Sequence, residues 1–337
     1  LWVGCGADES QAGGSLTYTG MSDGASESST QGTPSDAEST SAPADESTGV
    51  AETQSEESAE EESGDGPKLD TLPAEGGESG TGVGCEKIDF LFILDNSGSM
   101  AAHQANMIAN FGPFMDTIAS DVEAMDYQIM VLDTDGPPDM SGGPGDGTCE
   151  ETLGAGQVRN CSVPDGKRYL TSDIGFDSIK STFSCIADVG VGGSANEMPM
   201  SALVEAVGPQ NEAGACNEGF IRNDAVLVVT IISDDHPGWF GDDNVNGYGG
   251  NAQSWFDAVV AKKGTAENVV VLGLYALLED QSCIGFGPQE AGPFIAFTEM
   301  FGDHGLVHSV CDPDYNQFFQ DAVALIDTTC DEFEPVD

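Results

Sequence analysis

Residues Ile88–Leu94 read IDFLFIL, and the six residues that follow, Asp95 to Met100, read DNSGSM. The first stretch is apolar almost throughout, which is typical of a strand buried on both faces of a sheet. The second stretch brings a carboxylate, two hydroxyls and a glycine to the point where that strand ends. This junction predicts the fold class and the location of the functional site.

The same alternation recurs along the chain. Further buried strands are expected at Tyr127–Leu132, Ala225–Ile232, Val269–Tyr275 and Gly305–Val310. Apolar residues at helical spacing predict helices at 100–120, 176–186, 199–207, 252–262, 293–301 and 314–326. Strands that alternate with helices in this way indicate an α/β fold with a doubly wound, mostly parallel sheet flanked by helices. Ligands of such sheets bind at the carboxyl ends of the strands.

Charge and composition divide the chain into parts. The whole sequence carries 9 Lys+Arg against 59 Asp+Glu, a net charge of −50, and only 39% of its residues are hydrophobic. Residues 1–84 contribute −17 and residues 85–337 contribute −33. We expect residues 6–84 to form a disordered acidic linker, because their Ser, Thr, Glu and Gly residues bury too little apolar surface to fold. Residues 85–330 are expected to form the domain, and residues 331–337 an acidic tail.

This acidity excludes two classes of partner. A polyanion such as DNA or RNA would be repelled rather than bound through its phosphates. Binding to an anionic membrane surface through basic residues is excluded for the same reason.

The first five residues, Leu-Trp-Val-Gly-Cys, are interpreted as the remnant of a lipoprotein signal. They resemble the lipobox of bacterial lipoproteins, in which the cysteine, here Cys5, becomes lipid-modified. Since no apolar stretch reaches about 18 residues, attachment to a membrane is expected only through this lipid. The resemblance implies an extracytoplasmic protein at the bacterial outer membrane or cell surface; the alternative is a secreted or periplasmic protein.

The chain holds nine cysteines, so eight remain if Cys5 carries lipid. No CxxC pair occurs, and four disulfides in an oxidising compartment are expected instead. Eight cysteines permit 105 connectivities. Pairing of sequence neighbours predicts Cys149–Cys161, Cys185–Cys216 and Cys283–Cys311, which leaves Cys85–Cys330 to join the ends of the domain.

The DNSGSM sequence resembles the Asp-x-Ser-x-Ser motif of von Willebrand factor A domains, and the resemblance extends over residues 85–330. It implies a doubly wound domain with a metal-ion-dependent adhesion site (MIDAS), whose ligands here would include Asp95, Ser97 and Ser99. The family also uses a Thr from a glycine-rich loop, where this chain has Ser194, with Asn196 and Ser201 as rivals. A later Asp of the family corresponds to Asp234.

Independently of the family, these side chains offer the hard oxygen ligands that Mg²⁺ and Ca²⁺ prefer, and Mn²⁺ is a third candidate. A bound dication would reverse the local sign of a strongly acidic domain. Further Ca²⁺ sites are considered in two acidic loops, Asp133–Glu151 and 234–246.

The predicted function is a surface-anchored, monomeric binding module that is not an enzyme. It would use the metal to hold a protein or polysaccharide partner that offers a carboxylate. The loop after the third long strand, with Asp235, Trp239 and Phe240, is expected to contribute to partner specificity. The alternative is a metal-dependent hydrolase that activates water at the same site, with His236 as its candidate base.

Overall fold

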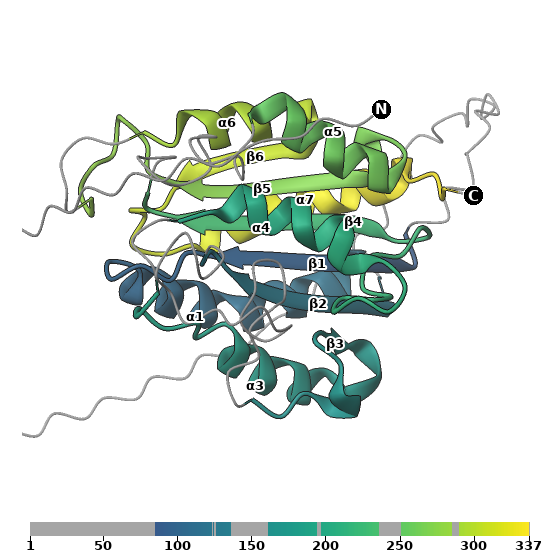
Figure 1. Cartoon of the computed structure of the whole chain (residues 1–337). Helices are drawn as coiled ribbons and strands as arrows, with labels where there is room; N and C mark the ends of the chain where they lie inside the picture. Colours follow the sequence, from purple (N-terminus) through teal and green to yellow (C-terminus); the bar gives the residue numbers. More distant parts are fainter. Residues whose placement is uncertain are drawn as a thin grey trace, which may run out of the picture. The chain divides into compact units, whose positions relative to one another are not determined.

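The computed structural model describes residues 85–135 except 123 and 125, and residues 161–193, 197–235, 251–284 and 290–336. All of them belong to one compact unit, Pro73–Asp337. Figure 1 shows this unit as a sheet with helices packed against it.

The sheet has six strands in the order β3-β2-β1-β4-β5-β6. The strands are β1 (Lys87–Leu94), β2 (Asp126–Asp133), β3 (Leu170–Thr171), β4 (Val226–Ser233), β5 (Val269–Tyr275) and β6 (Gly305–Ser309). All neighbouring pairs are parallel except β2 with β3. The predicted α/β class with a mostly parallel sheet is therefore confirmed.

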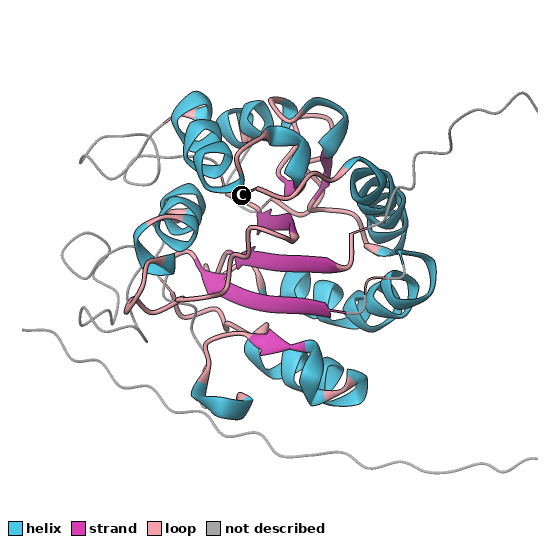
Figure 2. Cartoon of the chain, turned by 90° about the vertical axis from the view of Figure 1, so that its right-hand side faces the viewer, coloured by secondary structure: helices cyan, strands magenta, loops and turns pink. Residues whose placement is uncertain are grey.

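The side chains of β1 alternate between two hydrophobic cores, which explains its unbroken apolar sequence. Phe90 and Phe92 point into one core and Leu91 and Ile93 into the other, and all four are fully buried. Helices α1 (Ala101–Thr117), α3 (Phe176–Ile186) and α7 (Asn316–Glu332) cover the first core. Helices α4 (Pro199–Val207), α5 (Ala252–Lys263) and α6 (Gly292–Glu299) cover the second. Figure 2 shows the helices on both sides of the sheet.

All five predicted strands and all six predicted helices are present. Two features differ from expectation. The edge strand β3 has only two residues, too few for a pattern in the sequence to reveal. Helix α7 also continues beyond residue 330, and the backbone of Glu334 exchanges hydrogen bonds with the Asn268 side chain. Residues 331–336 are thus continuous with the domain and joined to it by these bonds.

The amino edge of the sheet is closed by an ionic network. Asp89 of β1 is fully buried and accepts hydrogen bonds from the backbone N–H and the Nε of Arg222, at 2.7 and 2.8 Å. The same guanidinium binds the Asp126 carboxylate at 2.7 Å. The buried Lys263 donates to the carbonyls of Arg222 and Ala225, each at 2.6 Å. Burial raises the pKa of Asp89 to about 6, and Arg222 opposes that rise.

Disulfides link elements that are distant in the sequence. The predicted Cys85–Cys330 and Cys283–Cys311 bonds are confirmed, with Cα–Cα distances of 4.6 and 5.2 Å. The first joins the start of β1 to the end of α7. Such bonds persist only in oxidising surroundings, which indicates an extracytoplasmic location.

The other two predicted pairings are wrong. Cys161 bonds to Cys185 at a Cα–Cα distance of 6.0 Å, so neither Cys149–Cys161 nor Cys185–Cys216 forms. Pairing by sequence proximity failed because the last turn of α3 returns to the segment that precedes the helix. Cys216 is also disulfide-bonded, and Cys149 lies outside the described residues.

Within the described part of the chain, no helix is long and apolar enough to cross a bilayer.

Candidate functional site

The candidate site lies where the order of the strands reverses, between β1 and β4. Their register aligns Leu94 with Ile232, the last apolar residues of each strand. The backbone N–H of Asp95 continues the pairing by donating to the Ile232 carbonyl at 3.0 Å. Asp95 and Asp234 therefore leave adjacent strands at the same edge, at the switch point where doubly wound sheets bind ligands.

Four of the predicted metal ligands lie together at this edge. One carboxylate oxygen of Asp95 accepts from the backbone N–H of Ser97 at 2.8 Å. The hydroxyls of Ser97 and Ser99 are 3.2 Å apart. Ser99 opposes the rise that burial causes in the pKa of Asp234, which places its hydroxyl near that carboxylate. Two carboxylates and two hydroxyls thus gather at the ends of β1 and β4.

Burial makes the two carboxylates of this group unusual. Asp95 is fully buried and Asp234 is 7% exposed. Burial raises the pKa of Asp95 to about 7; the Ser233 hydroxyl, which donates to its second oxygen at 2.7 Å, opposes the rise. Burial likewise raises the pKa of Asp234, against the effects of Ser99 and His103. Within the described residues, neither carboxylate has a salt bridge to Lys or Arg.

Gln104 of α1 fixes the backbone around the site. Its side-chain nitrogen donates to the carbonyls of Asp95 and Gly190, each at 2.9 Å, and its side-chain oxygen accepts from the Gly190 N–H at 3.2 Å. Gly190 has a φ of 77°, a conformation that other residues rarely adopt. The side chain of Gln104 therefore ties the Asp95 loop to the glycine-rich loop.

A second contact brings the glycine-rich loop still closer. The N–H of Gly193 donates to the Asn96 carbonyl at 3.1 Å. A Cβ atom at Gly193 would collide with the Asn96 side chain, so this approach requires glycine. The loop thus reaches the candidate site as predicted, although Ser194 and its rival Asn196 lie outside the described residues. The second rival, Ser201, lies buried on α4.

Sequence reasoning missed Glu197, which follows the glycine-rich loop. It is 4% exposed, and one carboxylate oxygen accepts from the Thr134 hydroxyl while the other has no hydrogen-bond partner among the described residues. Burial raises its pKa to about 10, and the neighbouring charges of Asp95, Asp135 and Asp235 add to that rise. The sequence offers one signal for Glu197, because it is an isolated acid just before the apolar residues of α4. The family resemblance, however, predicts a hydroxyl ligand in this part of the chain.

Asn96 and Asp135 extend this acidic region toward β2. The Asn96 amide donates to the Asp135 carboxylate at 3.2 Å, while its own side-chain oxygen is buried without a partner in the described structure. Asp135 also forms an isolated antiparallel bridge with Glu197. The carboxyl edge of β1, β2 and β4 is therefore rich in buried oxygen atoms.

The chemistry of these donors suits a hard cation, because carboxylate and hydroxyl oxygens are what Mg²⁺ and Ca²⁺ bind. In the described ranges, no three His, Cys, Asp or Glu residues lie close enough together to hold a metal by themselves. A metal here would accordingly depend on the two serines as well as on Asp95 and Asp234.

The predicted specificity residues are only partly described. Asp235 follows the site, and its N–H donates to the Ser233 hydroxyl at 3.1 Å. Trp239, Phe240 and the candidate base His236 lie outside the described residues, as do Cys5 and most of both loops considered for further Ca²⁺.

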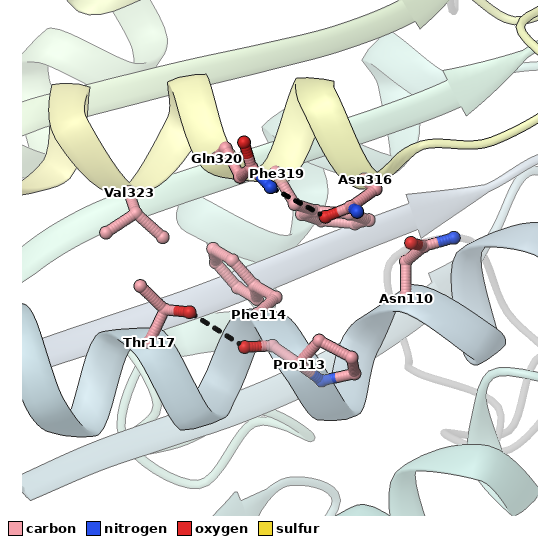
Figure 3. Close-up of a pocket in the computed structure, with 8 residues that line it drawn as sticks. All are labelled: Asn110, Pro113, Phe114, Thr117, Asn316, Phe319, Gln320 and Val323. Atoms are coloured by element: carbon pink, nitrogen blue, oxygen red, sulfur yellow. Dashed lines mark hydrogen bonds between the residues drawn. The ribbon is translucent and has the colours of Figure 1, made fainter. Parts of the chain in front are cut away.

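A hollow of about 200 Å³ lies away from this edge, between α1 and α7 (Figure 3). The Thr117 hydroxyl donates to the Pro113 carbonyl at 3.0 Å, and the Gln320 amide donates to Asn316 at 3.1 Å. None of the described residues that line this hollow is charged, so they offer no carboxylate like those of the carboxyl edge.

No protein-family model matches the sequence, and no curated protein matches it. Among solved structures, two of proximal thread matrix protein 1 from the mussel byssus are similar, with TM-scores of 0.42 and 0.41 and identities of 14% and 15%. The matches cover 72% and 71% of this chain but only 49% and 47% of those chains, about half their length. Similarity at this level concerns the fold alone.

Proposed function

We propose that this chain is a binding protein of the von Willebrand factor A type, whose MIDAS-type site holds Mg²⁺ or Ca²⁺. The metal would be used to grip a carboxylate of a partner molecule. In this proposal Cys5 carries a lipid, and residues 6–84 tether the domain to the outer surface of a bacterial cell. The domain itself acts as a monomer.

One observation carries the proposal: Asp95, Ser97, Ser99 and Asp234 gather at the switch point of the sheet. Hydroxyls and carboxylates in such contact are common in turns, but two of these groups are buried acids. Burial of an ionised carboxylate without a compensating charge is costly. A divalent cation is the partner that would remove this cost, and two carboxylates would neutralise its charge.

Asp95 and Asp234 are the residues that would hold the metal most directly, with Ser97 and Ser99 as neutral ligands. Gln104 keeps the Asp95 backbone in place, and Ser233 orients the Asp95 carboxylate. When bound, the cation would supply an open coordination position for a carboxylate of the partner.

We assign Glu197 a supporting role as a further oxygen donor, either directly or through a water molecule. Its free carboxylate oxygen is buried, and burial together with the nearby charge of Asp95 raises its pKa. The Glu197→Gln substitution keeps the shape and removes the group that would ionise when a metal binds, and it should weaken the affinity for metal by about 10-fold, as for other residues that support metal ligands.

The test is thermal unfolding and calorimetric titration of the full chain, first stripped with EDTA and then supplied with Mg²⁺, Ca²⁺ or Mn²⁺. A ligand present at about 100 times its dissociation constant should stabilise the native state by about 2.7 kcal/mol. The variants Asp95→Asn and Ser99→Ala should lose this stabilisation.

Two controls match these variants in chemistry. Asp327→Asn changes an exposed acid on α7, and Ser181→Ala changes an exposed serine on α3. Both should respond to metal like the wild type. If Asp95→Asn were stabilised by metal as strongly as Asp327→Asn, the site would not be the metal site and the proposal would fail.

A further inference from the structure

Next to the candidate metal site, a hollow of about 410 Å³ lies between α1 and the loop 188–191, and we call it the α1 hollow. Its size is within the range of about 300–1,000 Å³ that is usual for ligand pockets. Gln104 belongs to its lining and also binds the Asp95 carbonyl, so the hollow adjoins the site directly.

The walls of the α1 hollow are apolar. On α1 they consist of three exposed alanines, Ala101, Ala105 and Ala109, together with the half-buried Ile108. On the opposite side is Val191, 43% exposed and one of two exposed large hydrophobic residues in the described structure. Small side chains on one face of α1 thus leave room for an apolar group of a partner.

The polar groups of the lining are unevenly available. Gln104 uses both its side-chain nitrogen and its oxygen in bonds to Asp95 and Gly190. Among the described residues, Asp188 is the one charged member of the lining; it is exposed, and no salt bridge to it occurs in this part of the chain. A guest in the hollow therefore meets apolar walls and one negative charge.

This combination selects among guests. A sugar needs several hydrogen-bonding groups and would find only Asp188. An uncharged apolar side chain would remove water from the Asp188 carboxylate and give nothing in return. A Lys or Arg side chain satisfies both features, because its aliphatic stem covers apolar surface while its charged end reaches the carboxylate.

We infer that the α1 hollow binds a Lys or Arg side chain of a protein partner whose neighbouring Asp or Glu occupies the metal site. The inference rests on the proposed function for the metal-bound carboxylate, and it favours a protein over a polysaccharide. The strongly negative charge of the domain, −33 over residues 85–337, adds long-range attraction for the basic side chain.

The experiment uses acetylated, amidated peptides in which Lys and Asp are separated by about one to three glycines, a span of roughly 7–14 Å between them. Matched peptides replace Lys by norleucine, which keeps the stem without the charge, or by glycine. Binding to the ¹⁵N-labelled full chain is measured by NMR titration, in Mg²⁺ and in EDTA. We expect the Lys peptide to bind about 3- to 5-fold more tightly than the norleucine peptide, as for a partly exposed ion pair.

Two variants test the hollow itself. Asp188→Asn should abolish the difference between Lys and norleucine, whereas Asp327→Asn, with the same change of charge on α7, should preserve it. Ala105→Leu fills the hollow with a residue that favours helix formation. It should weaken binding of the Lys peptide to the level of the glycine peptide. Ala324→Leu, at an exposed position of α7, is its control.

The outcomes of these titrations distinguish the proposal for the metal site from the inference about the α1 hollow. If EDTA leaves affinity unchanged while Asp188→Asn still removes the preference for Lys, the metal proposal fails and the hollow stands. If Mg²⁺ strengthens binding of every peptide but norleucine equals Lys, or Ala105→Leu has no effect, the inference about the hollow is overturned and the metal site stands.

Discussion

The two ends of β1 each carry a fully buried aspartate, but their surroundings differ. At the amino edge, Asp89 is held by Arg222, and Lys263 lies close by. At the carboxyl edge, the hydrogen-bond donors that Asp95 meets among the described residues are the neutral groups of Ser97 and Ser233. Near one end of β1 lies a buried acid that the chain neutralises itself, and just beyond the other end lies one that no cation of the described residues pairs with.

This difference separates a structural role from a functional one. A buried ion pair within the chain fixes the packing of β1 against the segment before β4, and it has no need of a ligand. A buried acid that meets only neutral donors is stabilised most by a cation from outside the chain. The amino edge therefore contributes to stability, whereas the carboxyl edge is suited to binding a ligand.

The largest expected effect on stability follows from removing Arg222, the cation that pairs with Asp89. Arg222→Met would leave Asp89 buried without its partner, and the free energy of unfolding should fall by about 3–5 kcal/mol. Urea denaturation in EDTA measures this loss. Lys262→Met, at a half-exposed neighbouring cation of α5, should cost less than about 0.5 kcal/mol. A similar small loss for Arg222→Met would mean that the network is not what stabilises the amino edge.

Replacement of Asp by Asn at the two ends of β1 should change the free energy of unfolding in opposite directions. In EDTA at pH 8, Asp89→Asn should destabilise the domain by about 1.5–3 kcal/mol, because it weakens charged hydrogen bonds to Arg222. Asp95→Asn should stabilise it by about 1 kcal/mol, since it removes a buried charge that has no cation. Denaturation of both variants under identical conditions measures these two changes. If both variants lost or both gained stability, the two aspartates would not differ in role as proposed.

The stability should also depend on pH, for a related reason. The folded-state pKa of Asp95, about 7, lies above its ordinary value of 3.8, so the folded state binds the additional proton between these pH values. In EDTA the wild type should therefore lose stability relative to Asp95→Asn as the pH rises from about 4 to about 7, by at most about 1.4 kcal/mol per pH unit.

Above about pH 7 the difference should stay constant, and saturating Mg²⁺ should reverse it. The shifted pKa of Asp89 is shared by both proteins and cancels in the difference between them. A difference that does not change with pH in EDTA would show that Asp95 is ionised throughout and that burial does not raise its pKa.

Much of the fold was predictable because the signal is local. The apolar runs of β1, β4 and β5 can only be buried strands, and α3 and α4 begin and end at the predicted residues. The placement of Asp95 and Asp234 at the same edge was also predictable, since both follow parallel strands that end there. Cys85–Cys330 was predicted only as the pair left after sequence neighbours were joined, and it is correct although two of those neighbour pairs are not.

The unpredicted features depend on the approach of distant segments. Cys161 bonds to Cys185 because α3 returns toward the chain before it. Glu197 feels the charge of Asp95 because the glycine-rich loop is held against the Asp95 loop by Gln104 and Gly193. No spacing in the sequence encodes these distances.

By itself, the sequence determined the α/β class, the order of strands and helices, and which oxygen-bearing residues follow β1 and β4, because periodicity and composition act over a few residues. Only the tertiary structure decided which buried acids are neutralised by the chain, that Glu197 belongs beside Asp95, and that a hollow with one charge adjoins the site. These depend on the packing of side chains from distant segments, which sets their burial and electrostatic environment.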